Sequence, residues 1–245
     1  MHTLLPAGRS EPGRLAAAAL AVVLALAAAP ASAAEPARKV RTASRIFEEL
    51  LLGSERVVPE PLLRQTRCLA VFPGVTEAAL GLGASHGRGV AACRGEGGEW
   101  SPPAFLTISG GSLGLQIGFR RVDLLLFFVS PKGARSLAEP KISLGGSVSI
   151  AAGPVDRTAA VSADPLYDRD VYLYSRARGL FAGASLEGSR IGAARRANEA
   201  YYGERLWPEQ ILFDGRVAAP PPEARALMDR LRELPPLAGP GPADG

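Results

Sequence analysis

A serine and a histidine stand side by side in GLGASHGRG, residues 81–89, a stretch that fits the G-x-S-x-G pattern of a hydrolase nucleophile. Such a serine sits on a sharp strand-to-helix turn, and an acid and then a histidine follow it in the chain. The only other histidine lies near the N-terminus, and neighbouring strand residues point to opposite faces, so His86 is poorly placed to serve Ser85. The sequence therefore favours a hairpin turn around Gly87 and Gly89, and an esterase that uses Ser85 is the weakest functional hypothesis.

Other chemistry-bearing residues are few. The chain contains neither the phosphate-loop pattern nor a dinucleotide-binding glycine pattern between a strand and a helix. Two cysteines and the scattered histidines form no metal-ligand set, so we expect no metal and no cofactor. Cys68 and Cys93 are instead expected to form a disulfide. Asp123 lies within an apolar run, where a structural hydrogen-bonding role is favoured over a catalytic one.

The N-terminal residues 1–33 predict a secretory signal peptide. Arg9 and Arg14 precede the uncharged apolar run 15–29, and Ala31-Ser32-Ala33 supplies the small residues of a cleavage site. We therefore expect a periplasmic or extracellular protein, possible contact with a membrane surface, and an oxidising compartment for the cysteines. The formal net charge is +4 with both signs interspersed, which does not indicate a nucleic-acid partner.

The spacing of apolar residues in the rest of the chain predicts an α+β fold that is mainly antiparallel β. Apolar residues at helical spacing predict helices over 37–52, 61–67 and 220–234, and shorter ones over 130–139 and 195–203. Between them, residues 68–192 predict short strands, among them 112–119 and the doubly apolar 122–129. Glycines inside strands allow bends and close backbone approach, so we expect a barrel-like, closed or nearly closed sheet with N-terminal and short peripheral helices.

Three ordered blocks resemble the bacterial branch of the SYLF domain family. They are GRGVAACRGEGGEWSPPAFLTISGGSLGLQIG at 87–118, LGGSVSIAAGPVDR at 144–157 and YSRARGLFAGASLEG at 174–188. The resemblance predicts a lipid-binding domain over 34–203, followed by a C-terminal extension, 204–245, with an amphipathic helix and a disordered tail rich in Pro and Gly. It implies binding of anionic lipid, especially phosphoinositides, actin contact in some eukaryotic members, and no enzymatic activity. His86 and Ser147 depart from the family pattern.

For an exported protein the expected ligand is anionic phospholipid, which the protein would recognise by phosphoinositide-like headgroups or by acyl chains. The helix over 37–52 would lie in a headgroup layer with basic residues outward and its apolar face buried in lipid. Arginines at predicted turns would form a phosphate-binding rim, although for each arginine taken alone an ordinary surface charge is the favoured interpretation. The candidate lipid-binding residues are Lys39, Arg41, Arg45, Phe47, Arg88, Arg94, Arg120, Arg121, Arg176, Arg178 and Arg190.

Two alternatives stay open at this point. The apolar face of the N-terminal helix is equally suited to packing on the sheet, and the two roles are compatible if the helix detaches. The whole protein is also compatible with an envelope scaffold whose C-terminal extension recruits a protein partner and which has no lipid ligand.

Overall fold

A computed structural model describes residues 31–52, 58–95, 97–153, 168–177, 180–181, 186 and 188–238. The helical elements are α2 (Ala31–Phe47), the π-helical η1 (Glu48–Leu52), α3 (Glu60–Gln65), α4 (Pro131–Ser136), α5 (Arg195–Tyr202), α6 (Pro208–Leu212) and α7 (Pro222–Leu231). The strands are β1 (Cys68–Cys93), β2 (Ala104–Phe128), β3 (Lys141–Ser143), β4 (Ile150–Ala152), β5 (Val171–Ala177), β6 (Leu180–Phe181) and β7 (Arg190–Ala193).

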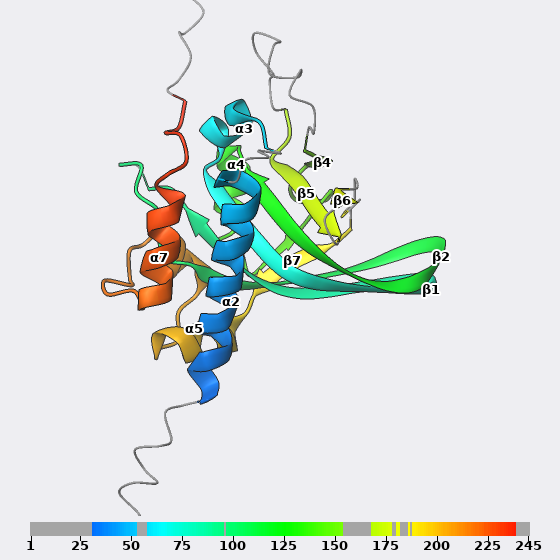
Figure 1. Cartoon of the computed structure of the whole chain (residues 1–245), viewed down its shortest axis with the longest axis horizontal. Helices are drawn as coiled ribbons and strands as arrows, with labels where there is room; N and C mark the ends of the chain where they lie inside the picture. The colour runs from blue at the N-terminus through cyan, green and yellow to red at the C-terminus, as the bar shows by residue number, and fades with distance from the viewer. Residues whose placement is uncertain are drawn as a thin grey trace, which may run out of the picture.

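Two very long antiparallel strands dominate the fold. β1 pairs with β2 from Cys68↔Phe128 to Ala91↔Ala104, and the paired strands extend well beyond the helices on one side (Figure 1). The two strands predicted at 112–119 and 122–129 are therefore parts of one strand. Arg120 and Arg121 do not interrupt it, because both continue the ladder opposite Glu77 and Thr76.

β1 folds back so closely that its two ends meet. Cys68 and Cys93 form the expected disulfide, with Cα atoms 4.0 Å apart. The Arg94 amide also donates to the Arg67 carbonyl at 2.7 Å. Gly89 lies where the two halves of the strand cross, and a Cβ there would come within 2.6 Å of the Phe72 ring.

The predicted hairpin turn around Gly87 and Gly89 is therefore wrong. Both glycines lie inside β1, paired with Ile108 and Leu106 of β2. A Cβ at Gly87 would lie 2.6 Å from the Val75 side chain, so these glycines allow close packing rather than a change of chain direction.

The seven strands form one sheet that curls into a half-barrel. Its order is β3-β7-β2-β5-β4, with β1 on β2 and β6 on β5, and only β4 and β5 run parallel. This confirms the predicted α+β class with a mainly antiparallel, barrel-like sheet, and the sheet curls as a half-barrel rather than closing.

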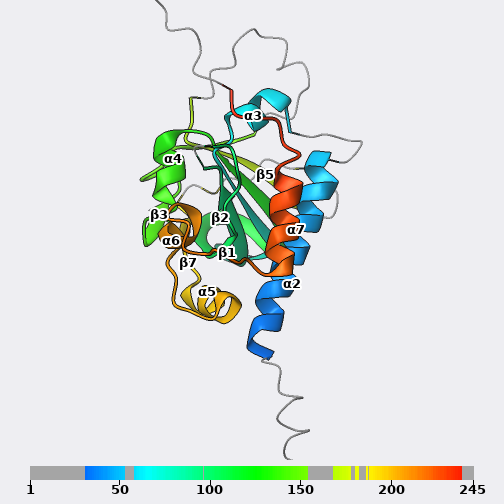
Figure 2. The same ribbon diagram turned by 90° about the vertical axis from the view of Figure 1, so that its left-hand side faces the viewer.

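Two hydrophobic cores lie on opposite faces of this sheet. Leu125 and Phe127 of β2 pack into a core with α2, α3, α5 and α7, whereas Leu124, Leu126 and Phe128 face a second core with α4 and α6. Figure 2 shows α2 and α7 on one side of the strands and α4 and α6 on the other. The doubly apolar run 122–129 is thus a central strand, as predicted.

The predicted helices form with shifted ends, and α6 was not predicted. The Ser130 hydroxyl accepts from the Gly133 amide at the start of α4, and α5 ends at Gly203, whose φ is +78°. In α7, Ala224 and Leu227 lie in the same core as α2, so part of the predicted C-terminal extension packs with the preceding residues. The domain boundary at 203 remains a prediction, and residues 1–30 lie outside the described part.

Asp170 joins α4 to the parallel strands. Its carboxylate accepts from the Ser130 hydroxyl and from the amide and hydroxyl of Ser149 at 2.8 and 3.0 Å, and Lys132 Nζ lies 3.5 Å away. Burial raises the pKa of Asp170, but these hydrogen bonds and Lys132 outweigh it and lower the pKa below its ordinary value. Asp170 therefore stabilises the fold as the carboxylate.

Candidate functional site

The outward face of α2 carries a stripe of three arginines, Arg38, Arg41 and Arg45. Their spacing of three and four residues places them on one side of the helix, and all three are exposed. The opposite side carries Val40 and Phe47, both 0% exposed in the core beneath α2. In this structure the apolar face packs on the sheet, and the cationic face is left for contact with other molecules.

A second cationic group forms where α2 crosses β1. Lys39 is half-buried, and Arg88 Nη1 lies 4.0 Å from Glu35 Oε2 on the same helix. Burial lowers the pKa of Lys39; Glu35 opposes this, and Arg88 and Arg38 lower it further. Asp123 also raises the pKa of Lys39, so three cations and two carboxylates act on one another here. The excess of cations is an arrangement that an additional anion would stabilise.

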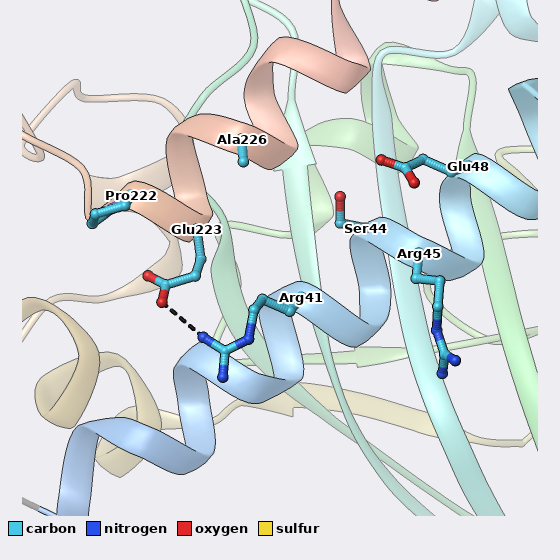
Figure 3. Close-up of a pocket in the computed structure, with 7 residues that line it drawn as sticks. All are labelled: Arg41, Ser44, Arg45, Glu48, Pro222, Glu223 and Ala226. Carbon is cyan, nitrogen blue, oxygen red and sulfur yellow. Dashed lines mark hydrogen bonds and ion pairs between the residues drawn. The ribbon is translucent and has the colours of Figure 1, made fainter.

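A groove of about 340 Å³ separates α2 from α7 (Figure 3). Arg41 Nη1 donates to Glu223 Oε1 across it at 2.8 Å, and Arg230 of α7 pairs with Glu48 at 2.8 Å. Arg45 extends away from α7 in Figure 3 and lies 3.9 Å from Glu49. The other lining residues are Ser44, Pro222 and Ala226. One ion pair to α7 therefore holds one arginine of the stripe, Arg41.

Two of the predicted rim arginines make internal contacts instead. Arg176 donates to Glu49 at 2.7 Å and to Asp123 at 3.0 Å. Burial lowers the pKa of Arg176, but the two carboxylates outweigh burial, so the pKa lies above its ordinary value. The other Asp123 oxygen accepts from the Gly74 amide at 2.8 Å, which is the structural role expected for Asp123.

Arg94 is also engaged within the fold. Its guanidinium lies 4.8 Å from the Trp100 ring centroid and donates to the Pro235 carbonyl at 2.7 Å. Burial lowers the pKa of Arg94. This arginine fixes the segment after α7 to the β1–β2 connection.

The remaining candidates are dispersed. Arg121 is exposed on the projecting part of β2, Arg190 is exposed on β7, and Arg120 is placed only by its position in β2. Arg178 lies outside the described residues. Arg88, Arg120 and Arg121 lie in the middle of strands, because the turns expected beside them do not form.

Ser85 does not lie on a strand-to-helix turn. It is a strand residue of β1 opposite Gly110, and it is followed by further strand. Among the described residues, no group of three His, Cys, Asp or Glu side chains could hold a metal ion. Within the same ranges, none of the helices has the length and apolar character needed to cross a bilayer.

Sequence reasoning missed several exposed or bridging residues. Arg38 could have been included, because it precedes Arg41 and Arg45 at helical spacing. Glu223 could not, because its pairing with Arg41 depends on the docking of α7. Phe119 is 66% exposed although it belongs to an alternating apolar pattern that predicts burial.

Comparison with known proteins identifies the family. The pattern of the Ysc84 family, described as Las17-binding protein actin regulator, matches residues 109–234. Protein YSC84 of Saccharomyces cerevisiae is 36% identical over 174 residues, which cover 70% of this chain and 37% of the yeast protein. LAS seventeen-binding protein 3 of the same species is 34% identical over 73% of this chain and 39% of its own length.

An animal relative gives the same result. SH3 domain-containing YSC84-like protein 1 of Xenopus laevis is 31% identical over 198 residues, which cover 78% of this chain and 58% of that protein. The chain thus spans well under two thirds of the length of these relatives. The bacterial branch stays a prediction, and the predicted family is confirmed: this chain belongs to the Ysc84, or SYLF, family.

Proposed function

We propose that the chain is an exported module that binds anionic phospholipid at the cationic side of α2. The observation that supports this most directly is the meeting of Arg38, Lys39 and Arg88 beside Glu35, together with the exposed arginine stripe. Arg88 comes from β1, so the fold brings cations from distant parts of the sequence to one surface. Phosphate groups would neutralise this surface.

Binding by the folded chain is then electrostatic. Each basic residue near an anionic membrane contributes about 1 kcal/mol, and salt weakens the attraction. Insertion of the apolar face of α2 would first expose Val40 and Phe47, at a cost of about 1.5–3 kcal/mol for each. The cationic face requires no such step, so it carries the proposal.

The experiment compares sedimentation with vesicles that contain phosphatidylglycerol and with vesicles of phosphatidylcholine alone. The double variant Lys39→Gln/Arg88→Gln removes two cations from the proposed surface and should bind about 30-fold more weakly, from about 2 kcal/mol of lost attraction. The control Arg135→Gln/Arg216→Gln removes the same charge from exposed positions away from α2. Equal binding of both variants, or equal binding to both kinds of vesicle, would refute the proposal.

A protein partner is the second candidate. The family description and the name of one relative refer to Las17 binding, and the exposed side chains of Trp207 and Phe213 at the two ends of α6 provide an apolar surface. Deleting α7 would not separate the two functions, because Ala224 and Leu227 belong to the core. Trp207→Ser is the cleaner variant, since it should weaken binding to a protein partner and leave vesicle binding unchanged.

A further inference from the structure

Among the residues whose side chains the structure describes, Phe119 is the most exposed large apolar one. It is 66% exposed, against 41% for Trp207 and 42% for Phe213. It lies in the outer ribbon, which we define as residues 75–84 of β1 with 111–122 of β2. Figure 1 shows this ribbon projecting past the helices.

The position of Phe119 explains its exposure. Alternation along β2 places Phe119, Arg121 and Asp123 on the same face as Leu125 and Phe127, which the helices cover. Phe119 lies beyond that cover. Its partner on β1 is Ala78, which is itself exposed and too small to shield an aromatic ring.

Positive charge accompanies this exposed ring. The Arg121 guanidinium lies 6.0 Å from the Phe119 centroid and is exposed. Glu77 is the only acidic residue in the sequence of the outer ribbon. An aromatic side chain beside an arginine matches the boundary between acyl chains and anionic headgroups, where the ring enters the apolar layer and the guanidinium stays with phosphate.

The ribbon and α2 also face the same side of the sheet. α2 covers the face that carries Leu125 and Phe127, and Phe119 continues that face. The arginine stripe points outward from the same side. A planar surface that meets the stripe can therefore approach the ribbon as well.

We propose that Phe119 is the apolar anchor of the protein, inserted at the surface of an anionic bilayer with Arg121 at the phosphate level. This inference rests on the proposed lipid-binding function and moves its apolar contact from Phe47, which is 0% exposed, to the ribbon. Arg121 then contributes both charge and orientation, because it lies against the ring that enters the lipid.

The test uses the complete exported chain and vesicles of phosphatidylglycerol mixed with phosphatidylcholine. Phe119→Ser should lower the vesicle affinity at least about tenfold, whereas Phe213→Ser should change it less than about twofold. Phe213 is a matched control, because it is also an exposed aromatic but directly follows α6, which packs on the opposite core. Circular dichroism and thermal unfolding should show both variants folded, since both side chains are largely outside the core.

A second measurement tests whether the side chain at position 119 enters the bilayer. Phe119→Trp and Phe213→Trp are made in a Trp207→Phe background, which leaves buried Trp100 as the only other tryptophan. Brominated acyl chains should quench the fluorescence of Phe119→Trp and not that of Phe213→Trp.

The results of these experiments distinguish a failure of the Phe119 anchor from a failure of the proposed lipid-binding function. If wild type binds anionic vesicles but Phe119→Ser binds equally well, or Phe119→Trp is not quenched, the anchor is refuted and the electrostatic function stands. If wild type binds no anionic vesicle, both fail. A Phe119→Ser variant that changes oligomeric state or binding to a protein partner, with unchanged vesicle binding, would assign the ribbon to protein contact and overturn the inference.

Discussion

Gly89→Ala tests whether close packing of β1 on itself shapes this fold. The added Cβ would lie 2.6 and 2.7 Å from carbons of the Phe72 ring and closer still to the Val71 carbonyl oxygen. A side chain can rotate away, but the carbonyl belongs to a paired strand, so the backbone must shift. Overpacking of this kind costs about 1–3 kcal/mol, against which the usual gain from replacing glycine is about 0.4–1 kcal/mol. Because the backbone must shift, the cost should lie at about 2–3 kcal/mol, and we expect a net loss of about 1–2.5 kcal/mol.

Gly192→Ala is the matched control in the same sheet. A Cβ at this position would lie 3.6 Å from the Pro140 carbonyl and from Thr107 Oγ1, which is ordinary contact. Thermal unfolding should show Gly89→Ala melting about 2–10 °C below wild type, and Gly192→Ala within about 2 °C of it. If Gly89→Ala is as stable as Gly192→Ala, the crossing of the two halves of β1 is not as close as described, and the explanation for this glycine fails.

Three further predictions concern charge, covalent closure and pH. Glu223→Gln should release Arg41 from its 2.8 Å ion pair and raise affinity for anionic vesicles about two- to fivefold in a sedimentation assay; unchanged affinity would mean that Arg41 does not contact lipid. Reducing the disulfide between Cys68 and Cys93, which are 25 residues apart, should lower the free energy of unfolding by about 3 kcal/mol in urea titrations, and a loss under about 1 kcal/mol would show that other contacts close β1. Because the pKa of Asp170 is lowered in the folded state, its contribution to the free energy of unfolding is present above its unfolded-state pKa and is lost as the pH falls through the folded-state pKa. Unfolding titrations from about pH 5 to about pH 3 should show this loss in wild type and less of it in Asp170→Asn. Equal pH dependence of the two proteins would contradict the role assigned to Asp170.

Helices and strands were predicted well where a local sequence pattern is compatible with only one structure. Ser130 and Pro131 specify the start of α4 because a hydroxyl can cap the first amides and proline needs no donor there. The run 122–129 specifies a central strand because residues apolar on both faces need two cores, and the structure supplies both. Strand length was harder to predict. Glycine fits both a turn and a close crossing, and only the distant partners of Gly87 and Gly89 decide between them.

The candidate site was less accessible to sequence reasoning, because its charges come from remote segments. Lys39 and Arg88 were each recognisable as basic, but their proximity depends on how α2 crosses β1. Arg94 and Arg176 looked equivalent to them in the sequence. Their engagement by Trp100 and by Asp123 shows that an arginine beside a strand is as readily a packing residue as a ligand-binding one.

The amphipathic pattern of α2 has two physical solutions, a protein core and a bilayer surface. Val40 and Phe47 suit either, and the choice depends on whether the sheet offers an apolar face of matching size. Leu125 and Phe127 provide that face, so burial in the core satisfies the apolar side of α2 and leaves its arginines exposed. Any apolar contact with lipid must then come from side chains that the core does not cover. The proposed apolar contact is therefore Phe119 rather than Phe47, and the proposed electrostatic and apolar contacts lie on two elements that can be mutated separately.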